Sequence, residues 1–316
     1  MQRYIANRFI AMLITLIGVT IIVFLMIRLV PGTIVELMMG TEALTSYESI
    51  ESLRQYFGLD LPVHIQYYEW ISRVVVGDLG TSWRSGIPVL QFILSRLPVT
   101  LELTLIAITV ALCIGVPTGI ISALARNSWL DNSSRIVALA GLSFPLPWLG
   151  TLLVLILSLT IGWSPSMTWV SPFEDLLANL KIMLVPGICL GTVSAAVIMR
   201  MTRSSMLDIL SQDYMRTARA KGLTERVVIA GHALKNTLIP VITVAGLQIG
   251  WLLGGSVVVE EIFTLPGLGR LVLWAIYQRD YPTVQGTVLF IAFMFMVVNV
   301  LVDILYAFVD PRIRYD

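Results

Sequence analysis

The sequence has few charged residues, and this shortage excludes an ordinary soluble domain. Charged residues make up 13% of the 316 residues, whereas hydrophobic residues make up 57%. Soluble domains carry about a quarter charged residues. The mean hydropathy is +0.85. Because the apolar residues are gathered in several long runs, the composition indicates a chain embedded in lipid.

Residues for metal binding, disulfides and catalysis are also scarce. The two cysteines, Cys113 and Cys189, lie inside apolar runs, and the two histidines, His64 and His232, are far apart. No cluster has metal-ligand spacing, so we expect no metal site. The sequence contains no phosphate-binding GxxxxGK[ST] loop and no plausible catalytic triad. We therefore expect no enzyme, no cofactor on this chain and no energy source of its own.

Six apolar runs are long enough to cross about 30 Å of hydrocarbon as helices. They predict an all-α integral membrane protein with six transmembrane helices. Strand-like alternation of the barrel type is absent. The predicted spans are residues 9–30, 99–124, 136–161, 182–199, 238–259 and 284–309.

The distribution of lysine and arginine predicts the orientation. With the N-terminus inside, thirteen of these cations lie inside and eight outside. Six spans then return the C-terminus to the cytoplasm. We divide the chain into an N-terminal segment with the first span (1–30), an extracytoplasmic helical region (31–97) and a five-helix core (98–316). The core includes a cytoplasmic loop at residues 200–237.

The extracytoplasmic region is expected to hold two helices. Residues 45–48 fit a capping box, and an apolar stripe follows it up to Gly58. A second helix is expected from Pro62 to a stop at Gly77. This region is expected to pack on the ends of the spans, and it can also serve as a docking surface for an external partner.

The loop at 200–237 is predicted to fold as helix, sharp turn and helix. Ser204 or Ser205 can cap the first helix, and Gly222 can stop it. Thr224 can cap the second helix, and Leu223 is placed for an apolar contact at the turn. The apolar stripe expected on the first helix consists of Met206, Leu210, Tyr214 and Ala218. The predicted helix has an apolar face that must pack against another surface. Because the loop is also folded and basic, we expect it to bind a protein partner.

Polar residues and glycines within the spans are further candidates. Ionisable or amide groups occur at Glu102, Asn299 and Asp303, where they can serve a function or simply bond a neighbouring helix. Span five carries glycines that permit close helix packing or line a path, and span two repeats this with Gly115 and Gly119. The glycines of span five are Gly246, Gly250, Gly254 and Gly255.

Several motifs together resemble those of the permease subunits of bacterial ATP-binding-cassette importers, and more narrowly of the dipeptide, oligopeptide and nickel permease subfamily. The resemblance covers nearly the whole chain. The motifs lie at residues 57–62 (FGLDLP), 77–80 (GDLG), 96–101 (RLPVTL), 213–223 (DYMRTARAKGL), 265–270 (LPGLGR), 279–282 (RDYP) and 310–314 (DPRIR).

The resemblance implies a coupling helix that fits a cleft on an ATPase subunit. The implied coupling residues are Asp213, Tyr214, Arg216, Thr217, Ala218, Arg219, Ala220, Lys221, Gly222 and Leu223. Importers more broadly have Glu-Ala-Ala, three further residues and a glycine there, and this chain lacks that glutamate. Thr33 also stands where the subfamily often has aspartate.

The resemblance further implies a second homologous permease subunit, two ATP-binding cassette subunits that hold ATP and magnesium, and an extracytoplasmic solute-binding protein. The expected location is the bacterial inner membrane. Short peptides are the expected substrates, with nickel chelates and glutathione as alternatives. Two alternative functions remain open. The chain can be an ion-coupled carrier that works alone, or a scaffold that recruits a cytoplasmic protein.

Overall fold

The computed structural model describes residues 2–28 and 61–309, and within these ranges it contains helices and no β-strand longer than an isolated bridge. The all-α fold class is therefore confirmed. The elements are α1 (Gln2–Arg28), α4 (Val63–Val75), α5 (Val89–Leu124), α6 (Trp129–Ser143), α7 (Leu146–Ile161), α8 (Leu176–Leu210), α9 (Asp213–Ala220), α10 (Glu225–Val227), η1 (Val228–Ala233), α11 (Leu234–Ile262), α12 (Leu268–Tyr277) and α13 (Tyr281–Val309).

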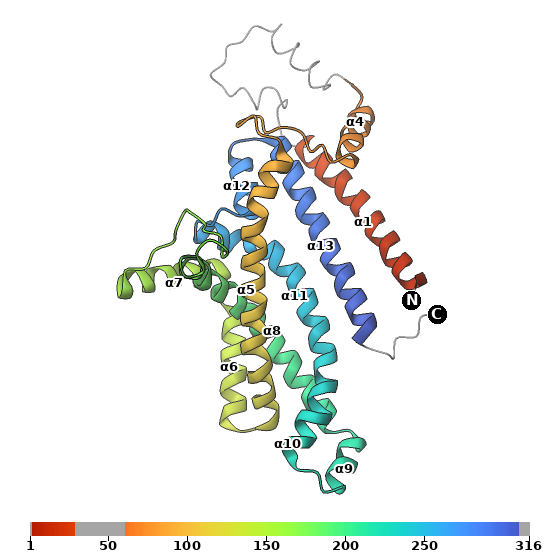
Figure 1. The fold of residues 1–316 in the computed structure, drawn as a ribbon, viewed down its shortest axis with the longest axis vertical. Coiled ribbons are helices and arrows are strands. Elements are labelled where there is room, and N and C mark those ends of the chain that lie inside the picture. The colour runs from red at the N-terminus through yellow and green to blue at the C-terminus, as the bar shows by residue number, and fades with distance from the viewer. Residues whose placement is uncertain (1, 29–60, 310–316) are drawn as a thin grey trace.

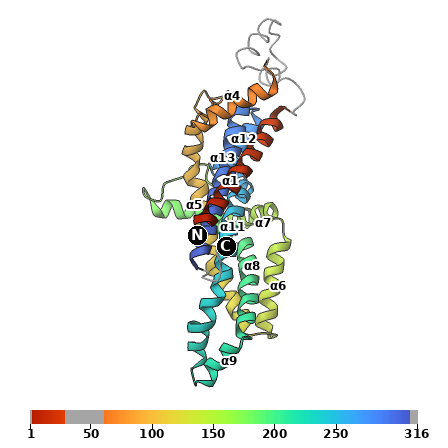
Figure 2. The same ribbon diagram turned by 90° about the vertical axis from the view of Figure 1, so that its right-hand side faces the viewer.

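Five helices are long and apolar enough to cross a membrane, namely α1, α5, α8, the α10–α11 segment and α13. The molecule is elongated, with α4 and α12 at one end and α9 and α10 at the other (Figure 1). Turning the molecule by 90° keeps these two ends apart (Figure 2). In both views α8 and α11 continue toward α9 beyond the ends of α1 and α13.

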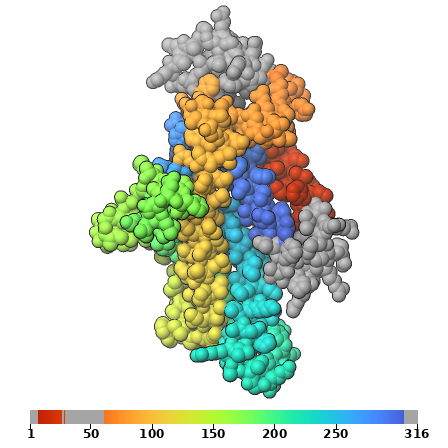
Figure 3. All heavy atoms as spheres, viewed as in Figure 1, coloured from red at the N-terminus to blue at the C-terminus, as the bar shows by residue number. Residues whose placement is uncertain are grey.

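The third predicted span, residues 136–161, is wrong as a single helix. The structure has two helices here, α6 and α7, bent by 101° at the break between them. Pro145 has no amide hydrogen, and it pushes the preceding Phe144 into an extended conformation, at φ −82° and ψ 131°. The pair can still count as one broken span. α7 and the segment that follows it project from the side of the bundle (Figure 3).

The centre of the bundle is the contact between α5 and α8, which is the most extensive helix pair. A Cβ at Gly115 or Gly119 would come within 2.7 Å of a backbone oxygen of α8, so only glycine permits this approach. Gly191 of α8 shows the same feature, because a Cβ there would lie 2.6 Å from the carbonyl oxygen of Ala107 on α5. The predicted close packing of span two is therefore present, and α8 is its partner.

Several helices extend beyond their predicted spans. α5 begins at Val89, so the predicted boundary at residue 97 falls inside a helix. α8 continues to Leu210, and Ser204 and Ser205 lie in its interior, so their prediction as helix caps is wrong. Before α5, helix α4 ends ahead of Gly77, which has a positive φ of 85°, and this confirms the predicted second helix. The first predicted external helix (45–58) and Thr33 lie outside the described residues.

Candidate functional site

The predicted coupling residues lie at the far end of the molecule, on α9 and the turn that follows it (Figure 1). α8 ends at Leu210, and Gln212 adopts an extended conformation before α9 begins. The break separates the last turn of α8 from α9, so the two helices do not share one continuous apolar stripe. The eight residues of α9 form a separate short helix at the tip.

One face of α9 is anchored in a buried cluster. Met215 and Ala218 are 0% and 7% exposed. They belong to the same apolar cluster as Met206 of α8, Val228 of η1 and Ala123 of α5. A force applied to α9 therefore reaches three membrane helices through close-packed side chains, because η1 leads directly into α11.

Tyr214 does not belong to this buried face, so the predicted stripe is wrong at this position. Its side chain is 41% exposed, and its hydroxyl accepts a hydrogen bond of 3.0 Å from Nδ2 of Asn236. Met215 takes the buried place instead. The helix break at Ser211 and Gln212 shifts the phase of the apolar residues between α8 and α9.

The opposite face of α9 is exposed and polar. An ion pair within the helix joins Arg216 to Asp213 at 3.5 Å, with both side chains largely exposed. Arg219 reaches across the turn and pairs with Glu225 at 2.9 Å. Hydrogen bonding to this carboxylate raises the pKa of Arg219 above its usual value. The exposed residues of the predicted coupling set are Asp213, Tyr214, Arg216, Thr217, Arg219, Ala220, Lys221, Gly222 and Leu223.

Gly222 forms the turn after α9, as predicted. Its φ is +75°, a conformation in which a side chain is strained, although a Cβ there would meet nothing within 4 Å. Its amide donates to the carbonyl of Arg219 at 2.9 Å. Leu223 is 39% exposed and lies outside the buried cluster. Thr224 precedes α10 without a side-chain capping bond.

A pocket of about 560 Å³ opens between α8, the start of α9 and α11. Its lining includes Ser204 and Asp208 of α8, Tyr214 of α9 and Pro240 of α11. The exposed side of α9 is thus bordered by a hollow that can accept side chains of another protein.

The glycines of α11 face different surroundings. A Cβ at Gly246 would lie 2.2 Å from Cγ1 of Val302, and one at Gly250 would lie 2.8 Å from Cε2 of Phe295. The helix that packs against these two glycines is therefore α13 of the same chain. Gly254 is exposed and has no atom within 4 Å of its Cβ position, and Gly255 lies next to Trp251 of its own helix.

The three predicted intramembrane polar residues do not form one site. Glu102 accepts a hydrogen bond of 2.9 Å from Nε1 of Trp169. Asp303 of α13 forms an ion pair of 3.1 Å with Arg8 of α1. Asn299 has a buried Oδ1 without a partner among the described residues, and it lies beside Gly250.

Sequence reasoning missed a buried carboxylate, Glu260, near the end of α11. Its side chain is 0% exposed and accepts hydrogen bonds from Oγ1 of Thr100 at 2.7 Å and from the amide of Arg270 at 3.0 Å. Oγ1 of Thr100 in turn accepts from the amide of Leu268 at 2.8 Å. Thr100 and Glu260 thus hold the start of α12 against α5 and α11. Two family-like motifs, at 96–101 and 265–270, meet here.

A second missed carboxylate, Asp280, joins the loop between α4 and α5 (residues 76–88) to the start of α13. It is buried and accepts hydrogen bonds from the hydroxyl of Ser82, from the amide of Trp83 at 3.2 Å and from Oγ1 of Thr283 at 2.9 Å. Asp280 belongs to the motif at 279–282, and its partners Ser82 and Trp83 directly follow the motif at 77–80. The signals in the sequence that could have indicated these two carboxylates were the family motifs that contain them or their hydrogen-bond partners, or that directly precede those partners.

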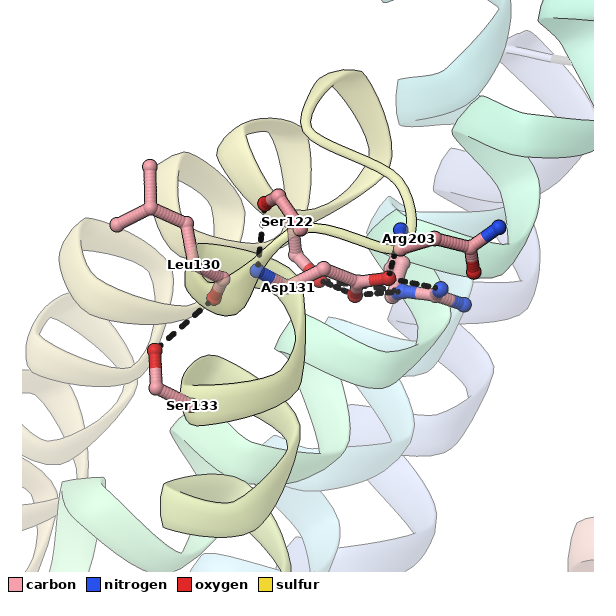
Figure 4. Close-up of polar contacts among 7 residues, drawn as sticks. Ser122, Leu130, Asp131, Ser133 and Arg203 are labelled. Carbon is pink, nitrogen blue, oxygen red and sulfur yellow. Dashed lines mark hydrogen bonds and ion pairs between the residues drawn. The ribbon is translucent and has the colours of Figure 1, made fainter.

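A third missed group is the ion pair between Asp131 of α6 and Arg203 of α8 (Figure 4). Asp131 is fully buried and accepts from Nε of Arg203 at 2.8 Å and from Oγ of Ser122 at 2.6 Å. Its second oxygen accepts from the amide of Asn127 at 3.0 Å. This network joins α5, α6 and α8 near the end of the molecule where α9 lies.

The fold resembles that of solved transporter membrane subunits. A structure described as an inward-facing conformation of the MetNI methionine ABC transporter aligns with a TM-score of 0.56 at 17% identity, covering 70% of this chain and 97% of that chain. At that identity the likeness shows the fold alone. It shows that the two chains share a helical fold.

Family models cover nearly the whole chain. Residues 115–315 match the family described as binding-protein-dependent transport system inner membrane component, and residues 1–104 match the N-terminal region of such components. The dipeptide transport system permease protein DppB of Alkalihalophilus pseudofirmus is 42% identical over 335 residues, with full coverage of both chains. The glutathione transport system permease protein GsiC of Escherichia coli K12 is 42% identical over 318 residues, also with full coverage. The chain therefore belongs to this family of inner membrane transport components.

Proposed function

We propose that this chain is the permease subunit of an ATP-driven importer for dipeptides and oligopeptides. Family membership and the names of full-length relatives support the peptide class. The observation that carries the coupling role is the two-faced α9, with Met215 and Ala218 buried and Arg216 and Thr217 exposed. A helix fixed on one side and open on the other is suited to transmit movement from a partner.

The proposed mechanism is alternating access driven from outside the chain. ATP and magnesium bind to two ATPase subunits, and their closure draws together the α9 helices of this chain and of a second homologous permease. Because α9 packs on η1 and shares a buried cluster with residues of α5 and α8, its displacement rocks the spans from inward-facing to outward-facing. An extracytoplasmic binding protein delivers the solute, and hydrolysis takes place on the partner subunits.

We place α9 in the cytoplasm, together with both chain ends. The loop between α8 and α11 is rich in lysine and arginine, which favours the inner side. The start of α1 and the end of α13 both point toward the α9 end of the molecule (Figure 1), which supports the same side for the termini.

The coupling role is tested at Gly222. Replacement by valine forces a β-branched residue into a φ of +75°, at a cost of about 1–3 kcal/mol in local strain. We expect Gly222→Val to abolish uptake while the binding protein still docks on the assembled complex. Gly222→Asn is the control, because asparagine tolerates this conformation, and it should retain most uptake. Unaltered uptake in the valine variant would contradict the coupling role of this turn.

The substrate is tested by uptake in a deletion strain that carries the chain with its partner subunits. Labelled dipeptides, oligopeptides, glutathione and nickel chelates are compared side by side. We expect peptides to accumulate in an ATP-dependent manner. Glutathione is the second candidate, because GsiC is as similar over its full length as DppB. If only glutathione is taken up, the substrate is glutathione and not a peptide. If an ion gradient drives uptake without ATP, the chain is an ion-coupled carrier.

A further inference from the structure

A second pocket, distinct from the one beside α9, lies between α6 and α8. Its volume is about 290 Å³. Arginines dominate its polar lining, with Arg135 from α6 and Arg200 and Arg203 from α8. Leu139, Met199 and Ser204 complete it. The pocket thus combines a cationic part with an apolar part.

The charge of this pocket is only partly neutralised. Arg203 is paired with Asp131, whose two carboxylate oxygens are already occupied by Arg203, Ser122 and the amide of Asn127. Arg135 and Arg200 are exposed, and within the described part of the chain their guanidinium groups form no ion pair or hydrogen bond. Two positive charges on neighbouring helices therefore remain available for an anion.

The position along the helices places these arginines at the edge of the apolar zone. Arg200 directly follows the apolar run at 182–199. On α6, Trp129 precedes Arg135 and is 75% exposed, and aromatic residues of this kind gather at membrane–water boundaries. After Arg135 come Ile136 and Val137, which are 66% and 70% exposed and suited to contact lipid.

We propose that this pocket binds the phosphate of an anionic phospholipid, with one acyl chain lying along the apolar face of α6. Arg135 and Arg200 hold the phosphate, and Leu139 and Met199 border the first carbons of the chain. Basic pockets between membrane helices are suited to such headgroups. A small soluble anion would use only the cationic part and leave the apolar lining without a function.

The bound lipid would bridge α6 and α8 beside the Asp131–Arg203 pair. It would thereby brace α6, which is otherwise followed by the break at Pro145 and the projecting α7. This inference concerns the membrane-facing surface and does not rest on peptide import.

The test is native mass spectrometry of the purified full-length chain titrated with phosphatidylglycerol, compared with phosphatidylcholine. We expect the double variant Arg135→Gln/Arg200→Gln to bind the first phosphatidylglycerol about 25-fold more weakly, a factor of roughly five for each arginine. The charge-preserving variant Arg135→Lys/Arg200→Lys should lose much less. Arg126→Gln/Arg226→Gln is the matched control, because both are exposed arginines outside this pocket and it should bind as the unaltered chain does.

Three outcomes would overturn the proposal. Equal loss in the control variant would mean that total charge, not this pocket, attracts the lipid. Displacement of phosphatidylglycerol by millimolar inorganic phosphate would indicate a site for soluble anions. Loss of the bound lipid in the assembled transporter would indicate that a partner subunit fills the pocket. Retained binding in the complex, resistant to phosphate and lost in the glutamine variant, would support the lipid site.

Discussion

Three buried carboxyl groups each hold separate segments of the chain together through hydrogen bonds. Asp131, Glu260 and Asp280 are each fully buried, and each accepts hydrogen bonds from at least two segments of the chain. A buried carboxyl group is costly unless it is hydrogen-bonded, and of these three Asp131 is also paired with a cation, Arg203. These residues therefore lie where helices must keep a defined distance, and not where they slide freely.

The Asp131–Arg203 pair gives a prediction at this scale. Asp131→Ala leaves the arginine without its partner, and removing one member of a buried pair costs about 3–5 kcal/mol. Because Arg203 is 21% exposed, we expect the lower end, about 3 kcal/mol. The double variant Asp131→Ala/Arg203→Met should be less destabilised than the single one. The measurement is the unfolding midpoint in lipid-free detergent, and equal midpoints for the two variants would contradict the pairing.

The sequence did not reveal these carboxylates, for a physical reason. Glu260 lies one residue beyond the predicted end of span five, and its partner Thr100 is 160 residues away. Asp131 falls in the short loop predicted between spans two and three, whose arginines were counted only for orientation, whereas the structure places it in α6. Hydropathy and charge counts report where a residue lies along the chain, but they do not report which distant donor will face it.

Whole helices were predicted more successfully, because an apolar run of twenty residues has few other structures in lipid. The third span was the exception. Its hydropathy continues through Pro145 and Pro147, so composition alone hides the 101° bend. The apolar stripe predicted for the helix at 206–218 was also misplaced, because a four-residue period holds only within one continuous helix, and α8 ends before α9 begins.

The packing of α11 on α13 gives a prediction at the scale of elements. Gly246→Ala would place a methyl group 2.2 Å from Cγ1 of Val302, and overpacking of this kind costs about 1–3 kcal/mol. Val302→Ala in the same chain should restore most of the loss, because the obstacle is a side chain. Gly254→Ala is the control, since its Cβ position is open. Thermal unfolding of the four chains checks this, and a destabilised Gly254→Ala or a failed rescue would contradict the contact.

At the scale of the whole molecule, α5, α8 and α11 connect two specialised ends. The exposed α9 lies at one end, and the contact of Asp280 with the loop between α4 and α5 lies near α12 at the other (Figures 1 and 2). Glycines keep α5 and α8 in close contact between these ends. A long, tightly packed pair of helices can carry a displacement at α9 across the membrane, whereas a loosely packed bundle would absorb it.

This arrangement predicts that the two ends are accessible from opposite sides of the membrane. In a chain with Cys113 and Cys189 replaced by alanine, Arg216→Cys and Ser85→Cys place single exposed thiols at the α9 end and in the loop between α4 and α5. We expect a membrane-impermeant maleimide to label the Ser85→Cys chain in intact cells and the Arg216→Cys chain only in inverted vesicles. The chain is expressed without its partners, so that no ATPase covers α9. Labelling of Arg216→Cys from outside intact cells would reverse the orientation, and with it the assignment of α9 as the element that meets an ATPase.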